Sequence, residues 1–257
     1  MENNWKSIIR ALPKPYYKDK YVQLYNADAI AIMRTLPDDS INLILTDPPY
    51  GLNYNEGDLA GHLAEVKGRM PRPVANDGED EANLLFRRML RQACRVLTSN
   101  GGCCCCCGGG GPKPLFARWV LWMDKYLHFK QAVVWDKDSL GLGLHYRRSY
   151  EFLLIATKTQ KCVWNGGRIM SNVWKLRRII PKDTQHPTEK PVALMGRAIE
   201  LHSNPGHIVL DPFSGHGSTL VAAKQLGRRA IGVEMDESYC DVIANKLWKT
   251  QVSFLGS

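Results

Sequence analysis

Short apolar runs alternate with longer amphipathic stretches along most of the 257-residue chain. Several of the runs are continuously apolar, as in central strands that are covered on both faces. Strands are predicted at residues 21–26, 41–47, 103–107, 131–135, 150–157, 207–213 and 229–235. Helical patterns lie between these runs, at residues 79–98, 113–127, 189–203, 217–226 and 237–249. Strands alternating with helices of this length predict a single α/β domain with a doubly wound, mostly parallel sheet.

Two stretches interrupt the alternation. Residues 51–78 are polar and rich in Gly and Pro, and they are long for a connection, which indicates a mobile element beside a site. Residues 136–185 interleave basic with aromatic side chains. Their candidate phosphate or base contacts are Arg147, Arg148, Lys175, Arg177 and Arg178, with Tyr146 and Trp174 available for packing or stacking. The alternative is a solvated basic face whose two aromatic residues belong to the core.

Five of the eight cysteines form one uninterrupted block, Cys103 to Cys107, with glycines on both sides. Adjacent cysteines cannot form a spaced disulfide framework, and no CxxC pair recurs at the spacing of a zinc site. We interpret the block as a buried strand in which Cys serves as a small hydrophobic residue. A metal or redox role is the alternative, and we expect no metal site.

The composition is that of an ordinary globular protein, with 44% hydrophobic and 23% charged residues. A formal net charge of +9 favours a polyanionic partner such as nucleic acid, although a merely basic protein would also carry it. The sequence contains neither a signal-peptide core nor an apolar stretch approaching the ~20 residues of a membrane span. We therefore expect a cytoplasmic protein without a membrane partner.

The predicted strand 41–47 runs directly into Asp47, Pro48, Pro49 and Tyr50. Two consecutive prolines cannot continue a helix or donate to a sheet, so the backbone is stiff and its carbonyl groups lack local partners. A rigid rim would then carry one acid, free carbonyl oxygens and one aromatic ring. A strand-ending turn with a capping Asp explains the same four residues equally well.

A glycine-containing turn, FSGHG at 213–217, follows another predicted strand and opens a helix. Gly215 and Gly217 allow close backbone approach, and the helix N-terminus offers N–H groups to a ligand. Leu220 stands where a dinucleotide-binding fingerprint would have its third Gly, which disfavours an NAD enzyme. Glu234 ends the next strand, where a ribose would present its hydroxyls. The glycine-containing turn and Glu234 together predict an adenosine-type ligand that lacks a pyrophosphate.

A third motif, HPTEKP at 186–191, stands at the start of a predicted helix. Its simplest interpretation is a capped helix start, with Thr188 as N-cap and Pro191 in the first turn.

Together, DPPY at 47–50, HPTEKP at 186–191 and FSGHG at 213–217 resemble the amino-group DNA methyltransferases of the permuted β class. The resemblance extends over residues 20–250 and rests on all three motifs in this order. It implies a seven-stranded Rossmann-like sheet with one antiparallel strand, S-adenosylmethionine as cofactor and double-stranded DNA as partner. It also implies target recognition by residues 136–185, a possible homodimer, and the cytoplasm of a bacterial or phage-infected cell.

The resemblance assigns catalysis to Asp47, Pro48, Pro49 and Tyr50. Asp47 and the Pro48 carbonyl would accept the two N–H groups of a base amino group, and Tyr50 would stack on the flipped base. Asp rather than Ser at the first position favours adenine N6, with cytosine N4 as the alternative. Two further alternatives are an inactive DNA-binding regulator on this fold and an RNA-directed enzyme. The loop 51–78 would close over the base.

The resemblance also assigns a set of cofactor contacts. Glu234 would bind the ribose hydroxyls, Thr188 and Lys190 would lie near the methionyl part, and Asp28 would lie beside the adenine with the small Ala29 next to it. The full set is Asp28, Ala29, Asp47, Thr188, Lys190, Asp211, Phe213, Ser214, Gly215, Gly217, Ser218, Thr219, Glu234 and Met235.

Overall fold

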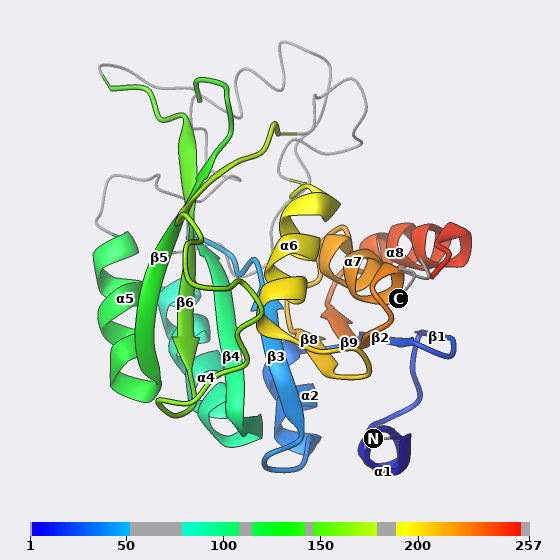
Figure 1. Cartoon of the computed structure of the whole chain (residues 1–257). Helices are drawn as coiled ribbons and strands as arrows, with labels where there is room; N and C mark the ends of the chain where they lie inside the picture. The colour runs from blue at the N-terminus through cyan, green and yellow to red at the C-terminus, as the bar shows by residue number, and fades with distance from the viewer. Residues whose placement is uncertain (1, 52–78, 108–114, 142–145, 179–188, 253–257) are drawn as a thin grey trace.

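One twisted sheet forms the centre of the computed structural model, which describes residues 2–51, 79–107, 115–141, 146–178 and 189–252. Its strand order is β1-β2-β9-β8-β3-β4-β6-β5-β7 (Figure 1). The strands are β1 Tyr17–Lys18, β2 Val22–Asn26, β3 Ile41–Thr46, β4 Leu97–Cys107, β5 His128–Asp136, β6 Tyr150–Thr157, β7 Val173–Lys175, β8 Ile208–Asp211 and β9 Arg229–Glu234. The helices are α1 Glu2–Arg10, α2 Ala29–Thr35, α4 Glu79–Val96, α5 Leu115–Tyr126, α6 Val192–His202, α7 Ser218–Gln225 and α8 Glu237–Lys249.

The seven predicted strands are the seven central strands of this sheet, and the mostly parallel arrangement is confirmed. Among these seven, β6 alone runs antiparallel to both of its neighbours, β4 and β5. The predicted total of seven strands is too low, because the sheet has nine strands within the described residues. The two additions are edge strands of two and three residues, β1 and β7, which are too short to show a hydrophobic period.

Two hydrophobic layers cover the two faces of the sheet, and the cysteine block divides between them. Cys103, Cys105 and Cys107 belong to the layer that packs against α2, α4 and α5. Cys104 and Cys106 belong to the layer formed with α6, α7 and α8, which lie together on the right of Figure 1. All five side chains are at most 2% exposed. The alternation is that of a strand buried on both faces, which confirms the interpretation of the block as a buried strand.

Helix α6 starts later than the sequence pattern indicated. It begins at Val192 with Pro191 at the N-cap position and without a side-chain cap, so Pro191 does not lie in the first turn. Proline disfavours helical geometry in the residue before it, so Lys190 stays outside the helix. The predicted N-cap, Thr188, lies outside the described residues. Within the part of the chain that is described, none of the helices combines the length and apolar character that crossing a membrane requires.

The strand directions bring the sequence motifs to one edge of the sheet. Strands β2, β9, β8, β3 and β4 are mutually parallel, so their carboxyl ends meet at that edge. Strand β5 ends there as well, and the antiparallel β6 begins there. In open α/β sheets this edge is where ligands bind.

Candidate active site at the carboxyl edge of the sheet

Strand β3 delivers Asp47 to this edge, where its side chain is 26% exposed. The Tyr50 hydroxyl donates a hydrogen bond to Asp47 Oδ1, and the Lys190 ammonium donates one to Asp47 Oδ2 at 2.6 Å. Burial and the neighbouring Asp47 carboxylate raise the pKa of Tyr50 well above its ordinary value, so its hydroxyl stays protonated as a donor. Both oxygens of the predicted catalytic acid therefore have defined partners.

Aromatic packing fixes the other end of the DPPY segment. The ring centroids of Tyr50 and Trp119 lie 5.9 Å apart, and Trp119 stacks on Phe86 at 3.9 Å between centroids. Pro48 is buried, and the segment 47–50 has no regular secondary structure, as two adjacent prolines require. The segment after β3 thus carries the predicted acid and aromatic ring on an irregular backbone.

Lys190 reaches Asp47 from the segment that precedes α6, 143 residues away in sequence. Its side chain is only 7% exposed, and its ammonium also lies 3.4 Å from Glu151 Oε2. Burial alone would lower the pKa of Lys190, but the carboxylates of Asp47 and Glu151 raise it above its ordinary value. Lys190 is therefore a permanent cation, and it cannot accept a proton during a reaction at Asp47.

The turn between β8 and α7 stands beside β3. Buried Asp211 accepts hydrogen bonds from Thr46 Oγ1 at 2.7 Å and from the Phe213 amide at 3.2 Å. Burial raises the pKa of Asp211 to about 7. Ser218, at the start of α7, donates through its hydroxyl to the Lys190 carbonyl at 2.7 Å. The glycine turn and the Lys190 segment are thus directly joined.

Glu234 ends β9 next to this turn. Its Oε2 accepts from the Gly215 amide at 2.8 Å, and its Oε1 accepts from the Asp236 amide at 2.9 Å. Burial raises the pKa of Glu234. Gly215 has a φ of 49°, and open space lies where a side chain would stand. The predicted pairing of a glycine turn with a strand-end acid is therefore formed.

The remaining predicted cofactor residues differ in their surroundings. Asp28 follows β2, and its carboxylate accepts from the Ala31 amide at 2.7 Å as the N-cap of α2. Ala29, Ser214 and Thr219 are buried, whereas Met235 is 47% exposed. Thr188 and the loop from residue 52 to 78 lie outside the described residues.

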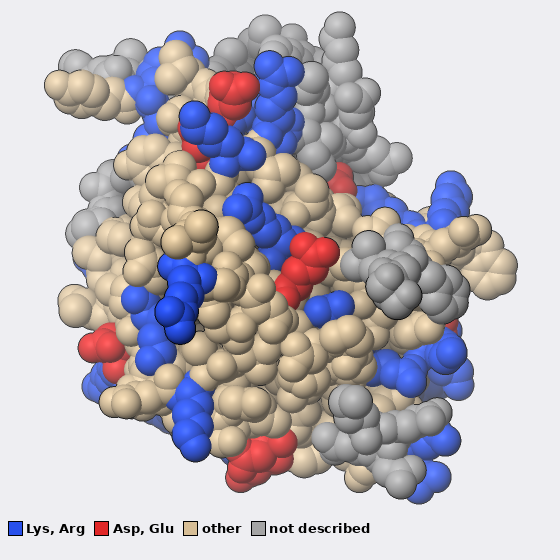
Figure 2. Space-filling model, viewed as in Figure 1, with Lys and Arg blue, Asp and Glu red and all other residues tan. Residues whose placement is uncertain are grey.

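The predicted DNA contacts are all exposed: Arg147 and Arg148 precede β6, and the others end or directly follow β7. Figure 2 shows basic side chains gathered over the end of the molecule where β6 begins, with acidic side chains among them. Arg177 pairs with Asp138 at 3.2 Å, and Arg147 donates to the Gly141 carbonyl at 2.8 Å. The other three predicted contacts are Arg148, Lys175 and Arg178.

The two aromatic residues of this region, Trp174 and Tyr146, differ in their exposure to solvent. Trp174 is 2% exposed, and its ring lies 4.8 Å below the Arg197 guanidinium, so it is a core residue as the alternative interpretation held. Tyr146 is fully exposed and remains available for stacking.

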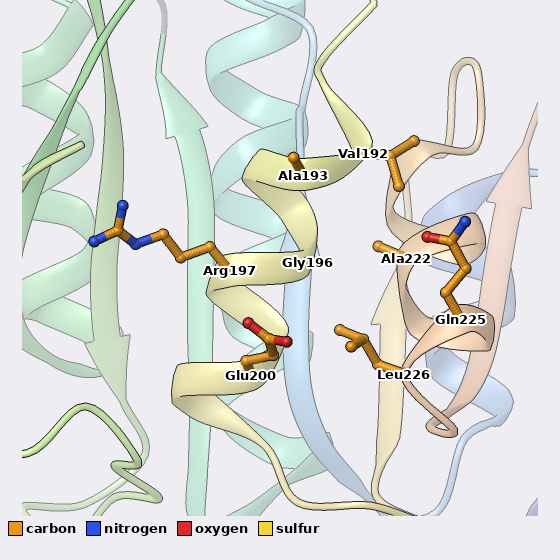
Figure 3. Close-up of a pocket in the computed structure, with 8 residues that line it drawn as sticks. All are labelled: Val192, Ala193, Gly196, Arg197, Glu200, Ala222, Gln225 and Leu226. Carbon is orange, nitrogen blue, oxygen red and sulfur yellow. The ribbon is translucent and has the colours of Figure 1, made fainter. Parts of the chain in front are cut away.

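A separate groove of about 630 Å³ lies between α6 and α7 (Figure 3). Small and apolar side chains form much of its lining, together with Arg197 and Glu200. None of the motif residues Asp47, Gly215 or Glu234 lines it. The groove is therefore distinct from the carboxyl edge.

Two charged residues beside the site, Glu151 and Lys137, were not predicted from the sequence. Glu151 lies at the start of β6, and Lys137 directly follows β5. The Lys137 ammonium donates a hydrogen bond to Glu151 Oε1 at 3.0 Å. Burial would raise the pKa of Glu151, but Lys190 and Lys137 lower it. The only sequence signal was a single acid inside the apolar run 150–157.

A glycine turn after one parallel strand and an acid ending the next form the arrangement that binds nucleosides in α/β proteins. The sheet and this edge thus define a nucleoside-binding α/β protein with a carboxylate at its open end. Residues 41–246 match the model of the DNA methylase family, N6_N4_Mtase, and the chain belongs to that family. The resemblance of its motifs to the amino-group DNA methyltransferases is confirmed at the level of this family.

Individual proteins extend the comparison. The DNA adenine methyltransferase YhdJ of Escherichia coli K12 is 28% identical, with 84% of this chain and 79% of YhdJ aligned. The structure of TTHA0409 from Thermus thermophilus, complexed with S-adenosyl-L-methionine, has a TM-score of 0.65 at 22% identity, covering 90% of this chain and 95% of that one. The PvuII cytosine-N4-specific DNA methyltransferase reaches a TM-score of 0.68 at 17% identity, covering 95% of this chain and 99% of its own. The two solved structures show the same fold.

Proposed function

We propose that this chain transfers a methyl group from S-adenosylmethionine to the exocyclic amino group of a base flipped out of double-stranded DNA. The observation that carries the proposal is the placement of Asp47 beside the β8–α7 turn and Glu234, at one edge of the sheet. Membership of the DNA methylase family supports DNA as the substrate.

The residues at the edge fit a nucleoside cofactor with a charged amino-acid end. Gly215 leaves open space over the turn, and Glu234 is already oriented by two backbone amides. Glu234 would bind the ribose hydroxyls, Phe213 and Gly217 would line the path beside it, and Asp28 would lie near the adenine. When bound, S-adenosylmethionine supplies an activated methyl group. The complex of the related fold TTHA0409 with this molecule agrees with the assignment.

Asp47 would make the base amino group nucleophilic. The nitrogen lone pair of that group is delocalised into the ring, and acceptors on its two N–H groups localise it. Asp47 Oδ2 is held by Lys190, so Oδ1 is the oxygen that can accept from the base. The Tyr50 hydroxyl holds Oδ1 in the DNA-free chain and would release it as the Tyr50 ring moves to stack on the base. The Pro48 carbonyl would accept the second N–H.

Adenine N6 is the target that we favour. An Asp stands first in the DPPY segment, and the relative YhdJ is named an adenine methyltransferase. Cytosine N4 is the second candidate, because the PvuII enzyme of the same fold is cytosine-N4-specific. Residues 136–185 would recognise the target sequence.

Mass analysis of nucleosides tests the proposal directly. Unmethylated DNA is incubated with the chain and S-adenosylmethionine, then digested to nucleosides. We expect N6-methyldeoxyadenosine. N4-methyldeoxycytidine would refute the adenine assignment and keep the reaction type, whereas unchanged nucleosides would refute methyl transfer itself. DNA incubated without S-adenosylmethionine is the control.

A further inference from the structure

We propose that Glu151 is a positioning residue, which holds the Lys190 ammonium against Asp47 and is itself held by Lys137. The inference rests on the proposed methyl transfer at Asp47 and adds two residues that no motif contains. Neither Glu151 nor Lys137 has to touch the substrate. Their effect reaches the reacting base through Lys190 and Asp47.

Four side chains of alternating charge form a continuous row. Lys137 Nζ lies 3.0 Å from Glu151 Oε1, Glu151 Oε2 lies 3.4 Å from Lys190 Nζ, and Lys190 Nζ lies 2.6 Å from Asp47 Oδ2. The middle contact is an ion pair without hydrogen-bond geometry, because Glu151 Oε2 is buried and has no hydrogen-bond partner among the described residues. The row ends at Asp47 Oδ1, the oxygen available to the base.

The row is largely shielded from water, so its charges depend on one another. The side chains of Lys190, Lys137 and Glu151 are 7%, 15% and 21% exposed. A shielded charge that loses its partner strongly destabilises the fold, because the remaining charge is left uncompensated. With these exposures, the charge of Glu151 should affect the position of Lys190 more than the charge of a surface ion pair would.

Glu151 supplies what Asp47 alone cannot. A lysine ammonium is a compact charge on a flexible four-carbon stem, and one carboxylate does not fix its position. The Lys190 backbone is anchored by the Ser218 hydroxyl, and its ammonium is held from two sides by Asp47 and Glu151. The fixed ammonium in turn determines which way the Asp47 carboxylate faces.

The row also connects the site to the candidate recognition region. Lys137 directly follows β5, Glu151 is the second residue of β6, and the two strands are paired. The segment between them contains the exposed Arg147 and Arg148. DNA contacts at Arg147 and Arg148 would therefore lie on the segment that joins Lys137 to Glu151, the residue that contacts Lys190.

The test compares Glu151→Gln with a matched carboxylate elsewhere. Asp19 is also 21% exposed and pairs with a shielded lysine, Lys224, at 2.6 Å. Asp19 lies between β1 and β2, which stand at the far end of the strand order from β6. We expect Glu151→Gln to lower kcat about 10- to 100-fold, the effect of misplacing a reacting group by roughly 1 Å or less. The dissociation constant for S-adenosylmethionine should change less than about threefold. Asp19→Asn should lower Tm and leave kcat unchanged.

Two further variants separate position from stability. Glu151→Asp keeps the charge and should recover part of kcat. The double variant Lys137→Met/Glu151→Gln removes the cation left unpaired in Glu151→Gln, so Tm should recover while kcat stays low.

The pH profile gives a reading that a purely structural role would not change. Lys190 is faced by Asp47 and Tyr50 after β3, by Cys106 of β4 and by Glu151 of β6. Lys190 stays charged in the wild-type chain, whereas loss of the Glu151 charge removes one of the two carboxylates that raise the Lys190 pKa, so kcat of Glu151→Gln should fall at high pH where the wild type keeps its activity.

Three outcomes would overturn the inference: an unchanged kcat in Glu151→Gln, an equal loss of kcat in Asp19→Asn, or a recovery of kcat together with Tm in the double variant. If the wild-type chain methylates DNA and any of these is found, the inference alone fails. If the wild-type chain transfers no methyl group, the proposed function fails and the inference falls with it.

Discussion

Replacing Asp211 by Asn should stabilise the protein, and increasingly so as pH rises. Asp211 is 2% exposed, lies between Thr46 and the β8–α7 turn, and has a pKa of about 7 because it is buried. Its Oδ1 accepts from both Thr46 and the Phe213 amide. An Asn oxygen can accept the same two hydrogen bonds, and the amide then resembles the protonated acid.

The magnitude follows from linkage between protonation and folding. The native chain keeps the Asp211 proton up to about pH 7, whereas the unfolded chain loses it near the ordinary value of 3.8. The native state thus binds more protons between these values, and wild-type stability falls as pH rises through this window. At 1.36 kcal/mol per pKa unit the full penalty is about 4 kcal/mol, of which roughly 2–3 kcal/mol develops between pH 5 and pH 8.

Thermal unfolding of both chains from pH 5 to pH 8 measures this difference. For a chain of this size 1 kcal/mol corresponds to about 2–4 °C in Tm, so the Tm advantage of Asp211→Asn should grow by roughly 4–12 °C over that range. Asp19→Asn is the control of opposite sign: burial opposes ionisation of Asp19, but Lys224 and two backbone amides lower its pKa below the ordinary value. A Tm difference for Asp211→Asn that does not depend on pH would refute the reasoning.

Three other predictions concern separate parts of the molecule. Burial raises the pKa of the thiols of Cys104, Cys106 and Cys107, and the hydrogen bond with Cys103 together with burial raises that of Cys105. An alkylating reagent should therefore modify the exposed Cys162 of the folded chain well before the buried cysteines of β4, as measured by peptide mass analysis. Gly217→Ala should cost about 1–2 kcal/mol, because φ is 78° and the new Cβ would lie 2.9 Å from Ile243, and thermal unfolding should show a lower Tm. Removing Arg147 and Arg148 together should reduce the salt dependence of DNA affinity by a slope of about 2, and an unchanged slope would exclude phosphate contacts.

Much of the fold could be predicted because its signals are local. The apolar runs identified all seven central strands, and the period-two division of the cysteines between two layers is a consequence of strand geometry alone. Strand direction is not a local property. The pattern at 150–157 predicted β6 but could not show that it runs against β4 and β5.

The same limit explains what was missed in the site. The reversal of β6 places Glu151 at the carboxyl edge of its neighbours, next to a lysine that follows β5. Lys190 meets Asp47 across 143 residues of sequence, so neither contact has a spacing that could be read from the chain. The placement of Asp47, Gly215 and Glu234 at strand ends and turns could be predicted because apolar runs and glycine-containing turns are visible in the local sequence.

Asp47 carries the central claim, and one comparison tests it most directly. Wild-type chain and Asp47→Ala are incubated with DNA and S-adenosylmethionine labelled in the methyl group, and cofactor binding is measured on the same preparations. The account predicts labelled N6-methyldeoxyadenosine from the wild type, none from the variant, and cofactor affinities that agree within about threefold. Undiminished transfer by Asp47→Ala would contradict it.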